Sequence, residues 1–142
     1  MLSATFIVQG KIKPKERPRV FKRRNGKYGI FTPKSTQASE ANIAKEYLTQ
    51  CRTHFGERYV ELDIRTYQEI PKSYSKKSRA LIAMGKLYPK RFDIDNLCKS
   101  IMDGLNNVAY IDDSQVVKIT CRKDYSTSTY TQITIKEFYE CD

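Results

Sequence analysis

Hydrophobic and polar residues alternate along several stretches of the chain, and this two-residue period is typical of strands with one buried face. It is clearest in "YVELDIRTY", which places Val60, Leu62 and Ile64 on one side of an expected strand. A shorter run from Ala4 to Val8 predicts a first strand. The segments "SQVVKITCRKDY" and "STYTQITIKEFY" alternate in the same way near the C-terminus, and we expect them to pair with each other as a hairpin.

Three other stretches predict helices. Thr32-Pro33 resembles an N-cap followed by a first-turn proline. The helix expected after it carries residues at helical spacing, namely Ala41, Ala44, Leu48 and Cys51. The segment "PKSYSKKSRALIAMGK" predicts a basic loop and then a short helix that ends near Gly85. A further helix is expected over roughly residues 95–106, with an apolar stripe formed by Leu97, Cys98, Ile101, Met102 and Leu105.

The stretch between Lys11 and Lys34 contains ten basic residues and one acidic residue. Within it, Asn25-Gly26 separates "RVFKRR" from "KYGIF", and this dipeptide is a strong signal for a tight hairpin turn because both residues tolerate positive φ. We expect a basic hairpin here and not a disordered tail, since it carries apolar side chains that could pack. They are Val20, Phe21, Tyr28, Ile30 and Phe31.

The expected elements follow the order β-β-β-α-β-α-α-β-β. This order predicts a mixed α/β (α+β) fold, with helices packed on a largely antiparallel sheet. The 142 residues contain no internal repeat or linker, so we expect a single domain over residues 1–142. No apolar run is long enough for a membrane span, and the N-terminus lacks the layout of a signal peptide, so a cytoplasmic protein is expected.

Charge divides the chain into two parts. Residues 1–90 hold 20 Lys or Arg against 7 Asp or Glu, whereas residues 91–142 hold 6 against 9. A basic surface around an acidic region would attract polyanions to a site that holds cations. The four cysteines are widely spaced and form no C-x-x-C pair, which argues against a zinc site. Cys98 and Cys121 are expected to be ordinary core thiols.

The acidic region starts with Asp93 and Asp95, two residues apart just before the expected third helix. In extended backbone both side chains point the same way, while Ile94 points toward the core. Either residue could be a helix cap, but capping needs only one such side chain. Two carboxylates together favour a cation between them.

More charged residues follow on the same helix and beyond it. Asp95, Lys99 and Asp103 recur every four residues and therefore share one face, where Asp103 could equally belong to a solvated row of ion pairs. Asp112 and Asp113 are expected to open a strand, so only one of the two can easily join the first pair. Strand parity does not decide which one.

Three carboxylates from a helix start and a neighbouring strand suit Mg²⁺ or Mn²⁺, hard ions that prefer oxygen ligands. Such an ion would lower the pKa of a bound water and stabilise charge on a phosphate. Together with the basic surface, this predicts a metal-dependent nuclease acting on nucleic acid.

The segments "DIDNLCKSIMDGLN" and "YIDDSQVV" resemble the signature of the RusA family of Holliday-junction resolvases. The close resemblance runs from about residue 91 to residue 123, and a looser one covers "KPKERPR", "FTPK" and "PKSYSKK". It implies a homodimeric, Mg²⁺-dependent endodeoxyribonuclease, with Mn²⁺ as a substitute, that resolves four-way DNA junctions by symmetric nicks. A more general branched-DNA nuclease stays open, as does a non-catalytic DNA-binding protein; a small-molecule phosphohydrolase would leave the basic region unexplained.

By position, the resemblance implies that Asp93, Asp95 and Asp113 are the catalytic metal ligands and that Lys99 is a catalytic lysine. The resemblance also implies Asp112 as a metal ligand, while Asp103 matches a further acidic family position. The candidate phosphate contacts are basic residues of the first ninety, namely Arg17, Arg19, Arg23, Arg24, Lys34, Lys76 and Lys77.

Overall fold

The computed structural model describes residues 1–13, 19–31, 34–91 and 93–140. Its elements in chain order are β1 (Ser3–Gln9), β2 (Arg19–Lys22), β3 (Tyr28–Phe31), α1 (Lys34–Gln50), β4 (Val60–Glu69), α2 (Lys76–Ala83), α3 (Ile94–Leu105), the 3₁₀ turn η1 (Asp113–Gln115), β5 (Val116–Ser126) and β6 (Tyr130–Glu137). The order predicted from the pattern is confirmed, as is the mixed α/β fold. The expected N-cap at Thr32-Pro33 lies outside the described residues.

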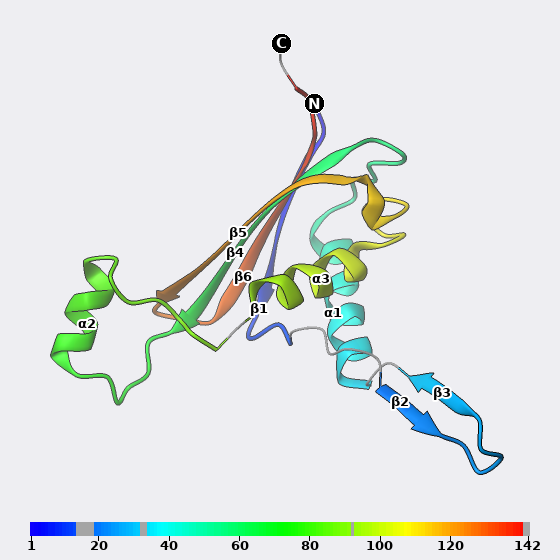
Figure 1. Ribbon diagram of the computed structural model, residues 1–142. Coiled ribbons are helices and arrows are strands. Elements are labelled where there is room, and N and C mark those ends of the chain that lie inside the picture. Colours follow the sequence, from blue (N-terminus) through cyan, green and yellow to red (C-terminus); the bar gives the residue numbers. More distant parts are fainter. Residues whose placement is uncertain (14–18, 32–33, 92, 141–142) are drawn as a thin grey trace.

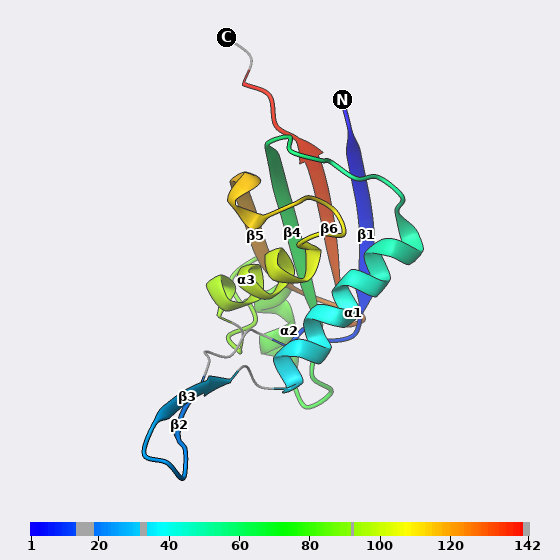
Figure 2. The ribbon, with the colours of Figure 1, turned by 90° about the vertical axis from the view of Figure 1, so that its right-hand side faces the viewer.

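A four-stranded sheet in the order β1-β6-β4-β5 forms the centre of the molecule (Figures 1 and 2). β6 pairs antiparallel with β1 and with β4, while β5 pairs parallel to β4. The predicted C-terminal hairpin is therefore wrong, because β4 lies between β5 and β6. The end of β4 is fixed there by the connecting turn, since Glu69 N donates to Thr129 Oγ1 at 3.0 Å and Ile70 N donates to Ser126 O at 3.1 Å.

The core lies between one face of this sheet and the two helices α1 and α3, which cross it (Figure 2). The alternating side chains of the strands supply the sheet side: Phe6, Val8, Val60, Leu62, Ile64, Ile133 and Ile135 are all buried. The ring of Tyr47 meets Phe6 edge-on at 5.2 Å between centroids. Burial of such apolar surface is the main stabilisation of the fold.

The two helices pack closely at Gly104. A Cβ at this glycine would lie 2.9 Å from the Cβ of Ile43, so α3 can approach α1 only because residue 104 has no side chain. The stripe predicted for α3 is buried as expected at Leu97, Cys98, Ile101 and Leu105. The face predicted for α1 is correct only in part. Ala44 is half-buried and Cys51 packs against the core, but Ala41 and Leu48 are exposed, and the helix instead buries Thr36, Ile43 and Tyr47.

β2 and β3 form a separate two-stranded hairpin that extends away from the rest of the molecule (Figure 1). The predicted turn is confirmed, since Gly26 has a φ of +83° and Gly26 N donates to Arg23 O at 2.9 Å. The expectation that its apolar side chains pack is confirmed only for Phe21 and Phe31, because Tyr28 and Ile30 are 70% and 72% exposed. Within the hairpin, the rings of Phe21 and Phe31 meet edge-on at 5.8 Å.

The remaining expectations concern α2, the thiols and membrane spans. α2 begins at an N-cap, where Ser75 Oγ accepts from Ser78 N at 3.1 Å, and it ends before Gly85, which has a φ of +69°. Cys51, Cys98 and Cys121 are free thiols, and Cys98 belongs to the core. Among the described helices, none is both long and apolar enough to cross a membrane.

Candidate active site

The first turn of α3 carries the acidic pair Asp93 and Asp95. Asp93 is the residue at the N-cap, yet its side chain makes no capping hydrogen bond to the helix backbone. Its Oδ2 instead accepts from Asn96 Nδ2 at 3.1 Å, and Asp95 Oδ1 accepts from Asn96 N at 2.9 Å. Capping therefore does not account for Asp93, and its carboxylate stays at the surface beside Asp95.

The local backbone differs from the extended form that the sequence suggested. The helix begins at Ile94, so Asp95 is helical, and Ile94 is 39% exposed and does not point into the core. The two carboxylates nevertheless meet. Their hydrogen-bonded contact raises the pKa of Asp93 above its ordinary value, with partial desolvation and the charge of Asp95 adding to the effect, and the nearby Lys123 opposing it. Two carboxylates in contact favour a bound proton or cation between them.

Lys99 lies one helical turn after Asp95 and contacts two other carboxylates. Its Nζ is 3.0 Å from Asp113 Oδ2 and 3.5 Å from Asp103 Oδ1. The hydrogen bond to Asp113 is the largest cause of a raised Lys99 pKa, so the ammonium form is held firmly. The side chain of Asp103 is only 14% exposed, which places it in this group rather than in a solvated row.

Asp112 and Asp113 lie on a short turn and not on a strand, because β5 begins only at Val116. The parity argument therefore does not apply. Asp112 caps η1 by accepting from Ser114 N at 3.2 Å, while Asp113 points to Lys99. A hydrogen bond from the Ser114 side chain lowers the pKa of Asp112, and the backbone hydrogen bond adds to the effect. Buried Gln115 closes a capping box with Asp112.

Gln115 also anchors this turn to the preceding loop. Its Nε2 donates to Gly56 O at 2.7 Å and to Arg58 O at 2.8 Å, while its Oε1 accepts from Ile111 N and Asp112 N. A buried side chain with four hydrogen bonds holds the backbone that carries Asp113 in one position. No role for Gln115 was inferred from the sequence, although this residue lies inside the "YIDDSQVV" segment.

Tyr110 is a second residue that the sequence did not single out. It is fully buried, and its hydroxyl donates to Met102 O at 2.8 Å. Burial raises its pKa far above the ordinary value, and the charges of Asp113, Asp103 and Asp112 raise it further. Tyr110 is thus a neutral buried side chain close to these carboxylates. Its hydroxyl joins α3 to the segment that leads into η1.

The predicted site residues thus fall into two neighbouring groups on one side of α3. One is the pair Asp93 and Asp95, and the other is Lys99 with Asp103 and Asp113. Within the described ranges, no group of three or more His, Cys, Asp or Glu side chains is placed to hold a metal ion together. The pair still fits a hard cation, because Mg²⁺ is usually held by one or two carboxylates, with waters and substrate phosphates completing its shell.

The candidate phosphate contacts flank this site. Arg19, Arg23 and Arg24 lie on the β2–β3 hairpin, and in Figure 1 α2, which carries Lys76 and Lys77, extends on the other side of α3. Lys34 begins α1, and all six side chains are exposed. Arg17 lies outside the described residues.

Two comparisons with known proteins are informative. The model of the family described as "Endodeoxyribonuclease RusA" matches residues 9–136. The chain is also 33% identical over 140 residues to the uncharacterized protein YqaN of Bacillus subtilis (strain 168), covering 93% of this chain and 94% of that protein. The residues that the family model matches include both acidic groups and most of the basic region.

Proposed function

Because the chain belongs to the RusA endodeoxyribonuclease family, we propose that it resolves four-way DNA junctions by paired symmetric nicks in recombination and repair. The proposed enzyme acts in the cytoplasm, depends on Mg²⁺ and accepts Mn²⁺ in its place. The observation that carries the proposal is the contact between Asp93 and Asp95, one helical turn before Lys99 and its partner Asp113. This arrangement combines a place for a cation with a fixed positive charge, which phosphodiester cleavage needs.

Asp93 and Asp95 are the proposed metal ligands, since their carboxylates already meet and a divalent cation would relieve their repulsion. Asp113 is proposed as the third ligand, which requires it to exchange its contact with Lys99 for the ion. When bound, the ion would supply charge stabilisation on the phosphate and a more acidic water. Asp112, engaged in capping η1, is proposed to support the site by holding the turn.

Lys99 is proposed to face the scissile phosphate. Its ammonium is half exposed and is held between Asp103 and Asp113. With Asp113 turned toward an ion, Asp103 would still orient the lysine from the same helix, and one face of the ammonium would be available to a phosphoryl oxygen. The lysine then neutralises charge that develops during cleavage.

The basic hairpin and α2 are proposed to hold the DNA arms. Residues 19–31 include five basic and no acidic residues, and they extend beyond the body of the molecule (Figure 1). A two-stranded ribbon of this kind can follow a DNA groove while arginines contact phosphates. Arg17 is proposed as a further contact from the adjoining segment.

A homodimer is proposed because a four-way junction presents two equivalent strands to be cut, and a two-fold dimer presents two equivalent active sites. Sedimentation velocity at micromolar concentration, with and without junction DNA, tests this. Two protomers per junction are expected. A monomer under both conditions would contradict the symmetric nicking scheme. It would still be compatible with cleavage of one strand of the junction at a time.

The decisive experiment incubates the protein and Mg²⁺ with four-way, three-way and linear DNA of matched sequence, and maps the cuts on each strand. We expect two symmetric cuts in the four-way junction and none in linear DNA. Cuts in three-way and four-way DNA alike would indicate a general branched-DNA nuclease. Tight binding without any cut would indicate a non-catalytic DNA-binding protein, and release of phosphate from small esters alone would indicate a phosphohydrolase.

A further inference from the structure

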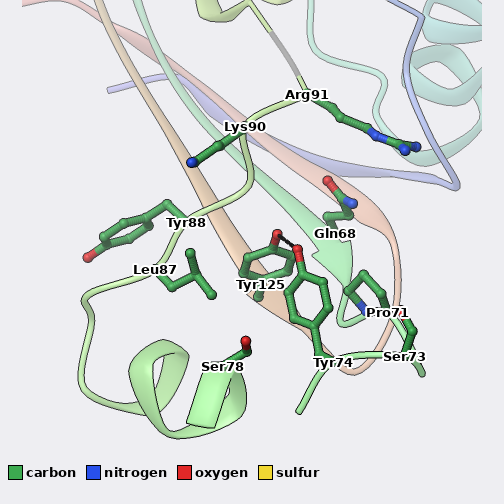
Figure 3. Close-up of a pocket in the computed structure, with 10 residues that line it drawn as sticks. All are labelled: Gln68, Pro71, Ser73, Tyr74, Ser78, Leu87, Tyr88, Lys90, Arg91 and Tyr125. Atoms are coloured by element: carbon green, nitrogen blue, oxygen red, sulfur yellow. Dashed lines mark hydrogen bonds between the residues drawn. The ribbon is translucent and has the colours of Figure 1, made fainter.

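A cavity of about 650 Å³ opens between α2, the segment after it and the ends of β4 and β5 (Figure 3). We call it the tyrosine pocket, because Tyr74, Tyr88 and Tyr125 all line it, together with Leu87, Gln68 and Arg91. Its volume lies within the range of about 300–1,000 Å³ that is usual for small-ligand sites. Neither of the two acidic groups of the candidate active site lines it.

The pocket is nonetheless adjacent to the active site. Lys123 on β5 is close enough to Asp93 to influence its pKa. Tyr125 follows two residues later on the same strand, so its side chain lies on the same face, about 7 Å further along. Arg91 also lines the pocket and is separated from Asp93 by a single residue. A DNA strand lying over Asp93 and Asp95 would therefore reach the pocket within one or two nucleotides.

Aromatic side chains form much of the pocket wall. The hydroxyls of Tyr74 and Tyr125 are hydrogen-bonded at 2.9 Å, and their rings meet edge-on at 5.8 Å (Figure 3). Desolvation, with this hydrogen bond, raises the pKa of Tyr125 to about 12, so the wall stays neutral at physiological pH. Leu87 and Tyr88 form the other side, and Tyr88 is 43% exposed.

Polar groups with capacity for a ligand complete the lining. The side-chain oxygen of Gln68 is buried and has no hydrogen-bond partner in the part of the chain that the structure describes. A buried acceptor of this kind is costly unless something donates to it. Lys90 and Arg91, on the segment after α2, also line the pocket, and both are exposed. The pocket thus offers aromatic faces, one hydrogen-bonding amide and two positive charges.

We propose that the tyrosine pocket binds one unstacked nucleotide of the DNA strand beside the cut. This inference rests on the proposed function. The base lies against the tyrosine and leucine walls, the Gln68 amide bonds its edge, and Lys90 and Arg91 contact the flanking phosphates. Amides of Gln recognise base edges, and aromatic rings accept any base face. A branch point favours this arrangement, because unstacking a base costs least where pairing is already interrupted.

An abasic scan tests the proposal. A series of four-way junctions each lacks one base near the cut, and binding is measured in EDTA for the wild-type protein and for Tyr88→Ala. Two further variants serve as controls. Tyr88→Phe keeps the ring. Tyr59→Ala removes a tyrosine that is 64% exposed and lies just before the first residue of β4, at the opposite end of this strand from the pocket. Thermal unfolding of each variant verifies that its fold is retained.

For the wild type, we expect the loss of one particular base to weaken binding about 5- to 150-fold, which is the effect of one stacked base. Tyr88→Ala should weaken binding to the intact junction and should be nearly insensitive to the missing base. Tyr59→Ala should behave as the wild type, and Tyr88→Phe, which keeps the ring, should restore the dependence on the missing base that Tyr88→Ala loses. Equal affinity of the wild type for every abasic junction, or an undiminished penalty in Tyr88→Ala, would overturn the pocket assignment.

Cleavage of the same junctions in Mg²⁺ separates this inference from the proposed function. Wild-type protein that cuts the junctions without any dependence on the missing base would overturn the pocket alone. Wild-type protein that neither binds nor cuts any of the DNA substrates would overturn both the pocket assignment and the proposed function. Gln68→Leu adds a further check, since we expect it to change which base at the sensitive position gives the tightest binding.

Discussion

The ammonium of Lys99 lies 3.0 Å from the carboxylate of Asp113, and this contact joins the middle of α3 to the turn that precedes β5. Asp103, one helical turn further on, approaches the same nitrogen at 3.5 Å. The lysine is therefore held by one carboxylate of its own helix and by one of another segment. In the proposed mechanism this group would exchange partners on binding, since a cation would attract Asp113 and a substrate phosphate would attract Lys99.

The acidic pair should be indispensable for chemistry and dispensable for folding. In Asp93→Asn or Asp95→Asn we expect the single-turnover cleavage rate to fall about 10²-fold or more, as when a preorganised charge is removed from an active site. Both side chains are exposed at the surface. We therefore expect the free energy of unfolding to change by no more than about 0.5 kcal/mol.

Asp63→Asn is the matched control for the acidic pair. Asp63 lies on β4 between the core residues Leu62 and Ile64, so it points to the sheet face opposite α1 and α3, where it pairs with Arg65. Its cleavage rate should equal that of the wild type. Wild-type rates in both Asp93→Asn and Asp95→Asn would remove these residues from the catalytic assignment.

Lys99→Ala should slow the chemical step much more than it weakens DNA binding. The rate under saturating protein should fall about 10²-fold, while the dissociation constant for a junction should change only a few-fold, on the scale of one phosphate contact. Lys118→Ala, which removes the lysine paired with Glu61, serves as the control. A loss of affinity with an unchanged saturated rate would make Lys99 a binding residue only.

Much of this site was predictable because it depends on local spacing. The stripe of α3 at Leu97 and Ile101 fixes which side faces the core, and the four-residue interval then places Asp95 and Lys99 together on the outer side. The contact between Asp93 and Asp95 was anticipated for a different backbone. Two residues around a helix start stay close in either conformation. The contact therefore did not depend on whether the backbone was extended or helical.

The relationships that the sequence did not reveal are those between distant segments. Alternation in β5 and β6 defines which side chains share a face, but it carries no information about which strand lies next to which. The position of Asp113 depends likewise on Gln115, whose partners are the carbonyls of Gly56 and Arg58 in a remote loop. The expectation that the apolar residues of the hairpin pack failed in part for a similar reason. Apolar character does not state which other residues are available to cover these side chains.

Gly104→Ala should destabilise the protein by about 1–3 kcal/mol, the usual cost of overpacking a close contact. The new methyl group would lie 2.9 Å from Ile43 Cβ and 3.1 Å from the carbonyl oxygen of Glu40, so α1 and α3 would have to separate. Urea denaturation measures the effect. If the contact is the cause, Gly104→Ala combined with Ile43→Ala should cost less than the sum of the single changes, whereas strict additivity would contradict this explanation.

The hairpin should contribute to DNA affinity through charge, independently of the catalytic group. In the double variant Arg23→Ala/Arg24→Ala we expect weaker junction binding, and the slope of log affinity against log salt should become shallower by about two, because two phosphate contacts are lost. Arg65→Ala/Arg122→Ala removes the same charge from the opposite sheet face, where both side chains are more than half exposed, at 55% and 64%. This control should keep the wild-type slope. A similar change of slope in both double variants would show that net charge, rather than contact by the hairpin, sets the salt dependence.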